Sequence, residues 1–335
     1  MEEINIPSHV DFFKALLRGL PEGAHSSYMT SLFFIVSGLD VLNELDCLNK
    51  QEIIDWIYKQ QIIPKIEPNY ASAGFRANPA TSSIEGSYWD YGNLASTYSA
   101  LGMLLILGDD FSRIDKVNLI GGIKLLQQEA GNFTSHKDGL EADMRFIFCV
   151  CAICYILDYW GEINQEKIVD FILKSQSYDK SIGLYPGIEG HGGLTYCALS
   201  SLFLLNKIDA LPEKEFLIEW LLMRQGIGFH GRIGKAPDSC YGYWIGLSLQ
   251  ILGGISFIDI NDNIQFYQET QFFKGGFSKY PCIEPDLVHS YLGLCSIAIM
   301  GHPQLSPIYG PLGITVRSAL RVIKNPLSQY TTINS

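Results

Sequence analysis

The chain has 335 residues, of which 47% are apolar and 18% charged, enough apolar content for a large buried core and too much for intrinsic disorder. Its formal net charge of −11 argues against general binding to nucleic acid, because affinity for a phosphate backbone depends on neutralising cations. The acidic start, Met-Glu-Glu, is unlike a basic secretory signal, and the most apolar run, 146–157, is too short to cross a bilayer. We therefore expect a soluble, cytoplasmic protein with reduced thiols, not an integral membrane protein.

Helix follows helix along the chain, and no stretch alternates well enough to predict a strand. A loop rich in Gly, Ser, Pro and Asn is expected at 63–91. The predicted helices cover residues 10–20, 28–45, 51–61, 94–108, 113–128, 143–159, 164–175, 193–206, 213–224, 240–253, 263–271, 287–300 and 312–323.

An internal repeat organises these helices. The helix-ending residues Gln128, Gln176, Gln225 and Gln271 lie 48, 49 and 46 residues apart, and each precedes a turn that contains glycine. The repeat turns are expected near 60–75, 128–133, 176–184, 225–229 and 271–277. In each period an amphipathic helix precedes one that is apolar all round and must be buried on every side. The pattern predicts one all-α domain over 1–335, an α/α toroid with six inner and six outer helices.

The stretch 231–244 carries Asp238 and Cys240, and His289 follows Cys240 by 49 residues, one repeat period. Equivalent ends of adjacent inner helices would bring these side chains to one rim of the toroid. A carboxylate, a thiolate and an imidazole would leave zinc an open fourth position, as in catalytic sites. The structural alternative makes Asp238 a helix N-cap, Cys240 a small buried residue and His289 a core or rim histidine. The one-period spacing favours the metal site.

A second cluster favours an anionic ligand. His191 stands at the start of an inner helix one period before Cys240, where backbone amides favour anions. With Arg232, Lys235 and Tyr241 it would form a cradle for a diphosphate. The alternative is that these are solvated rim residues.

Three motifs resemble those of protein prenyltransferase β subunits, and the resemblance extends over residues 27–300. They are His-Gly-Gly-Leu-Thr-Tyr-Cys, Gly-Phe-His-Gly-Arg-x-x-Lys-x-x-Asp-x-Cys-Tyr-x-x-Trp, and Gly-Gly-Phe followed by Pro-Asp-x-x-His. The resemblance implies a zinc enzyme, with one zinc ion per β subunit, that joins an isoprenoid to a cysteine held as thiolate near a protein's C-terminus. It implies that Asp238, Cys240 and His289 bind zinc. It also implies that His191, Arg232, Lys235 and Tyr241 bind the diphosphate.

At two positions the residue resembles that of the type I geranylgeranyltransferases and not that of the farnesyltransferases. Thr30 stands where farnesyltransferases carry a bulky Trp, and Lys279 where they carry an Asp thought to hold magnesium. The resemblance therefore implies geranylgeranyl diphosphate as the lipid donor and no requirement for magnesium. Lys279, Arg232 and Tyr241 would stabilise the departing diphosphate. The barrel interior, with Trp244 near its mouth, would hold the lipid tail.

The same resemblance also implies which residues bind the peptide substrate and which subunit pairs with this chain. Glu141 and Arg145 match residues near the peptide's C-terminal carboxylate, and Asn93 stands where relatives usually carry His. The implied partners are a prenyltransferase α subunit, which completes a heterodimer, and C-terminal C-a-a-X peptides of small GTPases, with X often Leu. Two alternatives remain open: a Rab-type geranylgeranyltransferase β subunit, and a non-catalytic helical binding module.

Overall fold

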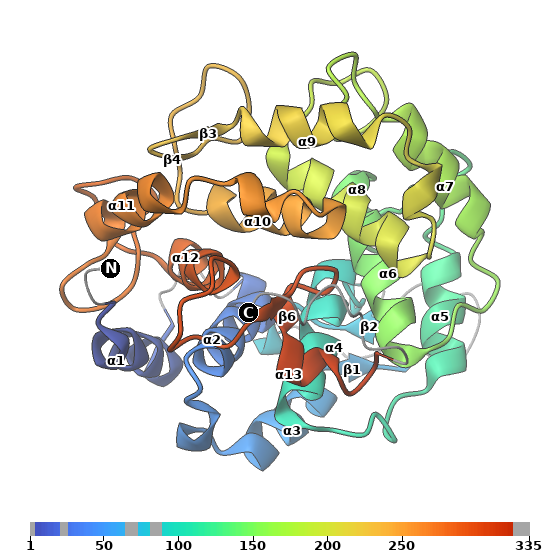
Figure 1. Ribbon diagram of the computed structural model, residues 1–335. Helices are drawn as coiled ribbons and strands as arrows, with labels where there is room; N and C mark the ends of the chain where they lie inside the picture. The colour runs from blue at the N-terminus through green and yellow to red at the C-terminus, as the bar shows by residue number, and fades with distance from the viewer. Residues whose placement is uncertain (1–3, 21–25, 64–72, 81–88, 324–335) are drawn as a thin grey trace.

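The computed structural model describes residues 4–20, 26–63, 73–80 and 89–323. Within them, six apolar helices form a closed inner ring, because each packs on the next and the last packs on the first (Figure 1). The inner helices are α2 (Tyr28–Val41), α4 (Leu94–Leu107), α6 (Met144–Leu157), α8 (Gly192–Leu204), α10 (Tyr241–Leu252) and α12 (Leu287–Ile299). The outer helices are α1 (Ile6–Arg18), α3 (Lys50–Lys59), α5 (Lys116–Lys124), α7 (Gln165–Lys174), α9 (Lys214–Leu222) and α11 (Ile260–Thr270).

The two layers follow from the apolar pattern. The outer helix α7 buries only Ile168, Phe171 and Ile172, along one face. The inner helix α6 buries nearly all of its residues, because it has neighbours on both sides and an outer helix behind it. The prediction of an all-α toroid is therefore confirmed. None of the helices in the described part of the chain combines the length and apolar character that crossing a bilayer requires.

The inner helices begin on one common rim. The backbone N–H of Leu94, at the start of α4, donates to Ser135 O in the loop that precedes α6. Equivalent bonds run from Met144 N to Leu184 O and from Gly192 N to Gly231 O. Residues at the N-terminal ends of successive inner helices therefore lie side by side, although about 50 residues separate them in the chain.

Short antiparallel pairs mark the repeat turns. Among the described residues they include β1 (Gln61–Ile62) with β2 (Gly74–Phe75), and β3 (Gln225–Gly226) with β4 (Gly228–Phe229). Isolated bridges pair Gln127 with Phe133, Gln176 with Ile182 and Gln271 with Phe277. We predicted no strands, and two-residue strands are too short to show alternation. These pairings also correct the predicted repeat. Gln127 pairs with Phe133 as Gln225 pairs with Phe229, so Gln127, not Gln128, is the residue equivalent to Gln225.

These glutamines join successive repeats. The Gln127 side chain donates to Asn164 O and accepts from Asn164 N, both at 3.0 Å. Gln225 makes the same two bonds with Asp259, at 2.6 and 3.0 Å. Asn164 and Asp259 are the N-caps of α7 and α11, so each glutamine fixes the start of the following outer helix.

The segment that follows α12 enters the barrel instead of forming the helix predicted at 312–323. It consists of β5 (Ile308–Tyr309), β6 (Ile314–Thr315) and the four-residue helix α13 (Val316–Ala319), and β6 lies near the centre of the ring in Figure 1. Gly310, Pro311 and Gly313 form the turn between the strands, and Gly313 has a φ of +64°, which favours glycine. We call residues 308–319 the plug.

Polar contacts hold the plug inside the barrel. The hydroxyls of Tyr98, Tyr196 and Tyr291 donate to the carbonyls of Leu312, Gly310 and Gly313 at 2.7–2.9 Å. The fully buried Asp40 carboxylate on α2 accepts bonds from the side chains of Thr315, Arg317 and Ser318. The plug therefore satisfies buried polar groups on several inner helices at once.

Each inner helix contributes one aromatic ring to a continuous circle around the barrel axis. Neighbouring ring centroids lie 5.2–6.3 Å apart, typical of favourable aromatic pairs. We call this circle the aromatic layer; its members are Phe33, Tyr98, Phe148, Tyr196, Tyr243 and Tyr291. Its members are the third to sixth residues of their helices and are mostly buried, so the aromatic layer fills the barrel about one turn below the rim.

Candidate active site

Asp238, Cys240 and His289 meet on the rim. Asp238 and Cys240 lie just before α10, and His289 is the third residue of α12. One potential ligand atom from each lies within 4.8 Å of the other two. Asp238 Oδ1 is 3.3 Å from His289 Nε2, and it also accepts the backbone N–H of Cys240 at 3.0 Å. The spacing of one repeat period therefore brings these residues together, as the sequence predicted.

Asp286 orients the histidine. It caps α12 by accepting the His289 N–H at 3.0 Å, and its other oxygen lies 2.5 Å from His289 Nδ1. Nε2 therefore faces Asp238. Burial lowers the pKa of His289, but the hydrogen bonds to Asp238 and Asp286 outweigh it and raise the pKa to about 9. The sequence analysis missed Asp286, although Asp-x-x-His at a helix start is a recognisable capping pattern.

The donor set suits zinc. A carboxylate oxygen, a sulfur and an imidazole nitrogen are all ligands of this ion, and three of them leave a fourth position for a substrate. A carboxylate that orients a ligating histidine, as Asp286 does, is the usual outer partner of such sites. Burial, followed by the Asp238 carboxylate, raises the pKa of Cys240, so its thiol would deprotonate near neutral pH only with a bound cation beside it. The residues present therefore fit a zinc ion.

Lys279 adds a positive charge beside this cluster. Its Nζ lies 3.5 Å from Asp238 Oδ2, and its side chain is 41% exposed. Burial lowers the pKa of Lys279, but the Asp238 carboxylate and Tyr280 more than offset this and hold it above its usual value. The ammonium group is therefore charged and open to an approaching anion.

His191 and Tyr241 form a second polar pair on the same rim. His191 caps α8, where its Nδ1 accepts the Gly193 N–H at 3.1 Å, and its Nε2 lies 2.9 Å from the Tyr241 hydroxyl. Because Nδ1 is an acceptor, the ring proton of the neutral histidine lies on Nε2 and is donated to Tyr241. The phenolic hydrogen is then free for another acceptor, such as a phosphate oxygen. Burial, followed by Arg232, lowers the pKa of His191 and so favours the neutral ring.

The two remaining cations lie in the loop before α10. Arg232 Nη1 is 3.1 Å from Glu189 Oε2, and both side chains are about half exposed. Within the described part of the chain, the exposed Lys235 side chain has no ion-pair partner. The sequence analysis missed Glu189, which would have to share Arg232 with an incoming anion.

Thr30 and Trp244 border the barrel interior. Thr30 lies in the first turn of α2, three residues before Phe33 of the aromatic layer, and accepts a bond from Ser99 on α4 at 3.3 Å. The Trp244 ring contacts Tyr196 and Tyr243, with centroids 5.3 and 4.6 Å away. Both side chains are half-buried. Thr30 and Trp244 therefore lie between the rim and the aromatic layer.

The three predicted peptide contacts are also on the rim, but they are not all together. Arg145 binds Asp143 at 2.7 and 3.0 Å and Glu141 at 3.2 Å. Asn93 caps α4 by accepting the N–H groups of Ala95 and Ser96. No hydrogen bond or ion pair joins Asn93 to that arginine cluster in the residues described. Asp143, the buried N-cap of α6, was missed as the main partner of Arg145.

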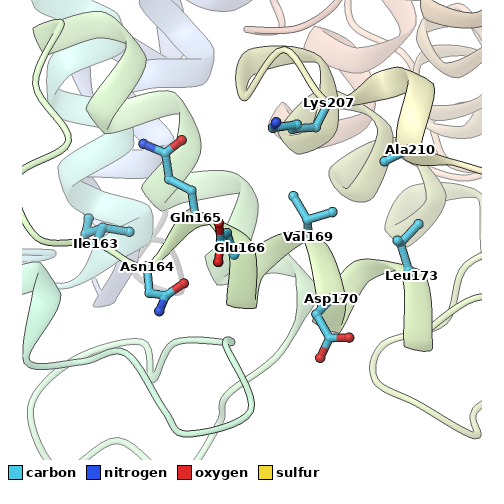
Figure 2. A pocket seen from close by; sticks show the side chains of 9 residues that line it. All are labelled: Ile163, Asn164, Gln165, Glu166, Val169, Asp170, Leu173, Lys207 and Ala210. Carbon is cyan, nitrogen blue, oxygen red and sulfur yellow. The ribbon is translucent and has the colours of Figure 1, made fainter.

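A separate groove of about 770 Å³ lies on the outer wall (Figure 2). It runs along α7 and the loop that follows α8, and combines apolar side chains with a few charged ones. Its lining residues are Ile163, Asn164, Gln165, Glu166, Val169, Asp170, Leu173, Lys207 and Ala210. None of the predicted site residues is among them, so we place the candidate active site on the rim.

Comparison with known proteins identifies the family. The family model described as "Prenyltransferase alpha-alpha toroid domain" matches residues 4–321. The chain is 37% identical to the geranylgeranyl transferase type-1 subunit beta of Dictyostelium discoideum, over 94% of this chain and 96% of that protein. It is 35% identical to the subunit of the same name from Arabidopsis thaliana, over 93% and 89% of the two chains.

A solved structure agrees. Candida albicans protein geranylgeranyltransferase-I complexed with GGPP superposes with a TM-score of 0.86 at 26% identity, covering 96% of this chain and 98% of that one. Type-2 geranylgeranyl and farnesyl transferase β subunits also match, over 48–74% of this chain. The chain therefore belongs to the protein prenyltransferases, as a β subunit that resembles those of the type-1 geranylgeranyl transferases.

Proposed function

We propose that this chain is the catalytic β subunit of a type I protein geranylgeranyltransferase. It would transfer geranylgeranyl from geranylgeranyl diphosphate to the cysteine thiol of a C-terminal C-a-a-X sequence. The observation that carries the proposal is the Asp238, Cys240 and His289 cluster with Lys279 beside it, on a toroid that matches type-1 subunits over nearly its whole length.

Asp238, Cys240 and His289 would hold one zinc ion, and Asp286 would keep His289 Nε2 directed at it. Bound zinc would supply a positive charge that lowers the pKa of the substrate cysteine, so that its sulfur is a thiolate near neutral pH. That sulfur would form a bond to C1 of the lipid as the C1–oxygen bond breaks. Cys240 would act as a ligand and not as the nucleophile.

The rim cations would stabilise the leaving group. As the C1–oxygen bond breaks, negative charge builds up on the diphosphate, and Arg232, Lys235 and the free hydroxyl hydrogen of Tyr241 would bind its oxygens. His191 would donate its Nε2–H to Tyr241 and so hold the phenol in place, with its own hydrogen directed at the diphosphate. A well-placed donor of this kind is worth roughly 3–4 kcal/mol in other enzymes. The Lys279 ammonium would supply the charge that a magnesium ion would otherwise provide, so we expect no magnesium requirement.

The remaining predicted residues would select the substrates. The small Thr30 side chain would leave room for the fourth isoprene unit, and Trp244 would line the path of the tail, with the aromatic layer at its inner end. Glu141 and Arg145 would lie near the peptide's C-terminal carboxylate, and Asn93 would contact the peptide from a separate place on the rim. The relatives are β subunits, and we propose that this chain likewise pairs with an α subunit.

The decisive assay is transfer of labelled geranylgeranyl to a peptide ending in Cys-a-a-Leu. The chain would be co-expressed with a matching α subunit and assayed with zinc and without magnesium. We expect transfer, with farnesyl diphosphate a much poorer donor. Absence of transfer by a folded, zinc-loaded heterodimer would contradict the proposal, and transfer only with an escort protein would indicate the Rab type.

A further inference from the structure

Ser239 lies between the two metal-ligand positions Asp238 and Cys240, but its polar groups bond elsewhere. It is fully buried. Its hydroxyl donates to Ser278 O at 2.8 Å, and its backbone N–H donates to Lys279 O at 3.2 Å. Both bonds go to the segment that carries Lys279 before α12, so Ser239 joins the loop before α10 to that segment.

The carbonyl of Ser239 is held as well. It accepts the hydroxyl of Tyr267, on α11, at 2.6 Å. A Cβ on Gly242 would come within 2.3 Å of that hydroxyl, so the absence of a side chain there lets Tyr267 reach Ser239. The Tyr267 ring is buried and packs edge-on against Phe277. Ser239 is therefore fixed on one side by an outer helix and bonded on the other to residues 278–279.

Lys279 depends on this arrangement more than Asp238 and His289 do. Its side chain is 41% exposed, contacts Asp238 at 3.5 Å and lies over the Tyr280 ring at 5.2 Å. The Lys279 side chain can bring its ammonium to Asp238 and the Tyr280 ring only from a backbone that lies within its reach, so the place where the backbone is fixed limits where the ammonium can stand. By contrast, the backbone of Asp238 is bonded to Phe229 O, and His289 is held by Asp286.

We propose that Ser239 is a positioning residue for the transfer reaction and that it acts through Lys279. By fixing the carbonyls of residues 278 and 279, it sets where the ammonium stands relative to Asp238, and hence to the diphosphate that leaves. The inference rests on the proposed function. It assigns Ser239 a role in the chemical step, in addition to the stability that any buried hydrogen bond contributes.

The test is a double-mutant cycle on the heterodimer with Ser239→Ala and Lys279→Ala. Ser239→Ala removes the bond to Ser278 O and should lower kcat about fivefold, the effect expected for one net hydrogen bond, with little change in the KM for either substrate. In the Lys279→Ala background the same substitution should change kcat by less than about twofold, because the group it positions is gone. If the kcat of the double variant falls by the product of the two single-variant factors, the two residues act independently and the proposal is overturned.

Zinc affinity, measured by competition with a chelator, is the readout that does not depend on activity. We expect Ser239→Ala to keep the wild-type zinc affinity within about twofold, because all three predicted ligands and Asp286 remain. A fall in zinc affinity that parallels the fall in kcat would mean that Ser239 acts on the metal site, and would overturn the role assigned through Lys279.

Ser248→Ala is the matched control. Ser248 is also fully buried, and its hydroxyl donates to Trp244 O at 2.7 Å within α10, with no link to residues 278–279. It should leave kcat unchanged, and a loss equal to that of Ser239→Ala would overturn the proposal. If Ser239→Ala does not fold, Tyr267→Phe removes the other fixing bond and takes its place in the cycle. An inactive wild-type heterodimer would contradict the proposed function itself.

Discussion

Replacing Gly313 by alanine tests how tightly the plug is seated in the barrel. Gly313 has a φ of +64°, and a Cβ there would lie 2.1 Å from the Tyr243 hydroxyl and 3.1 Å from that of Tyr196. The left-handed conformation costs an alanine roughly 1–2 kcal/mol. Forcing extra volume into a packed interior costs about 1–3 kcal/mol more. We therefore expect Gly313→Ala to lower the free energy of unfolding by about 2–5 kcal/mol.

Gly253 is the matched control for this variant. It ends α10 with a φ of +79°, and a Cβ there would meet no atom within 4 Å. Gly253→Ala should therefore show only the conformational cost of about 1–2 kcal/mol. Urea denaturation of the heterodimer, followed by fluorescence, would compare the two variants with the wild type. Equal losses would refute the reasoning, because they would mean that the plug moves away from the tyrosines without cost.

Three further outcomes are expected. Asp238→Ala or His289→Ala should abolish bound zinc and transfer together, and a normal zinc content in either variant would refute the ligand assignment. Lys279→Asp should make transfer depend on added magnesium, and a variant that stays magnesium-independent would show that Lys279 has another role. Burial lowers the pKa of His9 below 6.5, so the folded state favours its neutral ring, which accepts the Gly276 N–H. Stability should therefore be full above pH 6.5 and fall as the pH drops below this value, and an equally steep fall in His9→Gln, measured by urea denaturation at several pH values, would contradict this.

The inner ring and the proximity of Asp238, Cys240 and His289 were predictable because both depend on periodicity. A helix that is apolar all round must be buried, and residues one period apart must meet when the helices form a ring. The spacing alone therefore predicted that Cys240 and His289 lie close together. Lys279 was identified through the resemblance to the family. The roles of these residues in binding and transfer remain predictions.

What the sequence did not predict depends on contacts between distant segments. A helix at 312–323 matched the local apolar pattern, but the tyrosine hydroxyls of the inner helices stabilise a turn there instead. The partners Glu189 and Asp143 were missed for a similar reason, since a loop carboxylate shows its function only once its cation is placed beside it. Two-residue strands were too short for any periodicity.

The closure of the ring has a consequence for how the chain reaches its folded state. α12 packs on α2, and Asp40 binds Thr315 and Ser318, which lie 275 and 278 residues further along the chain. During synthesis, the earlier helices therefore have apolar faces that no later helix yet covers. These faces stay exposed until the C-terminal part of the chain has been synthesised. A ribosome-bound intermediate that lacks α12 and the plug would expose the edges of α2 and α10. We expect such intermediates to aggregate or to need a chaperone, whereas the complete ring does not.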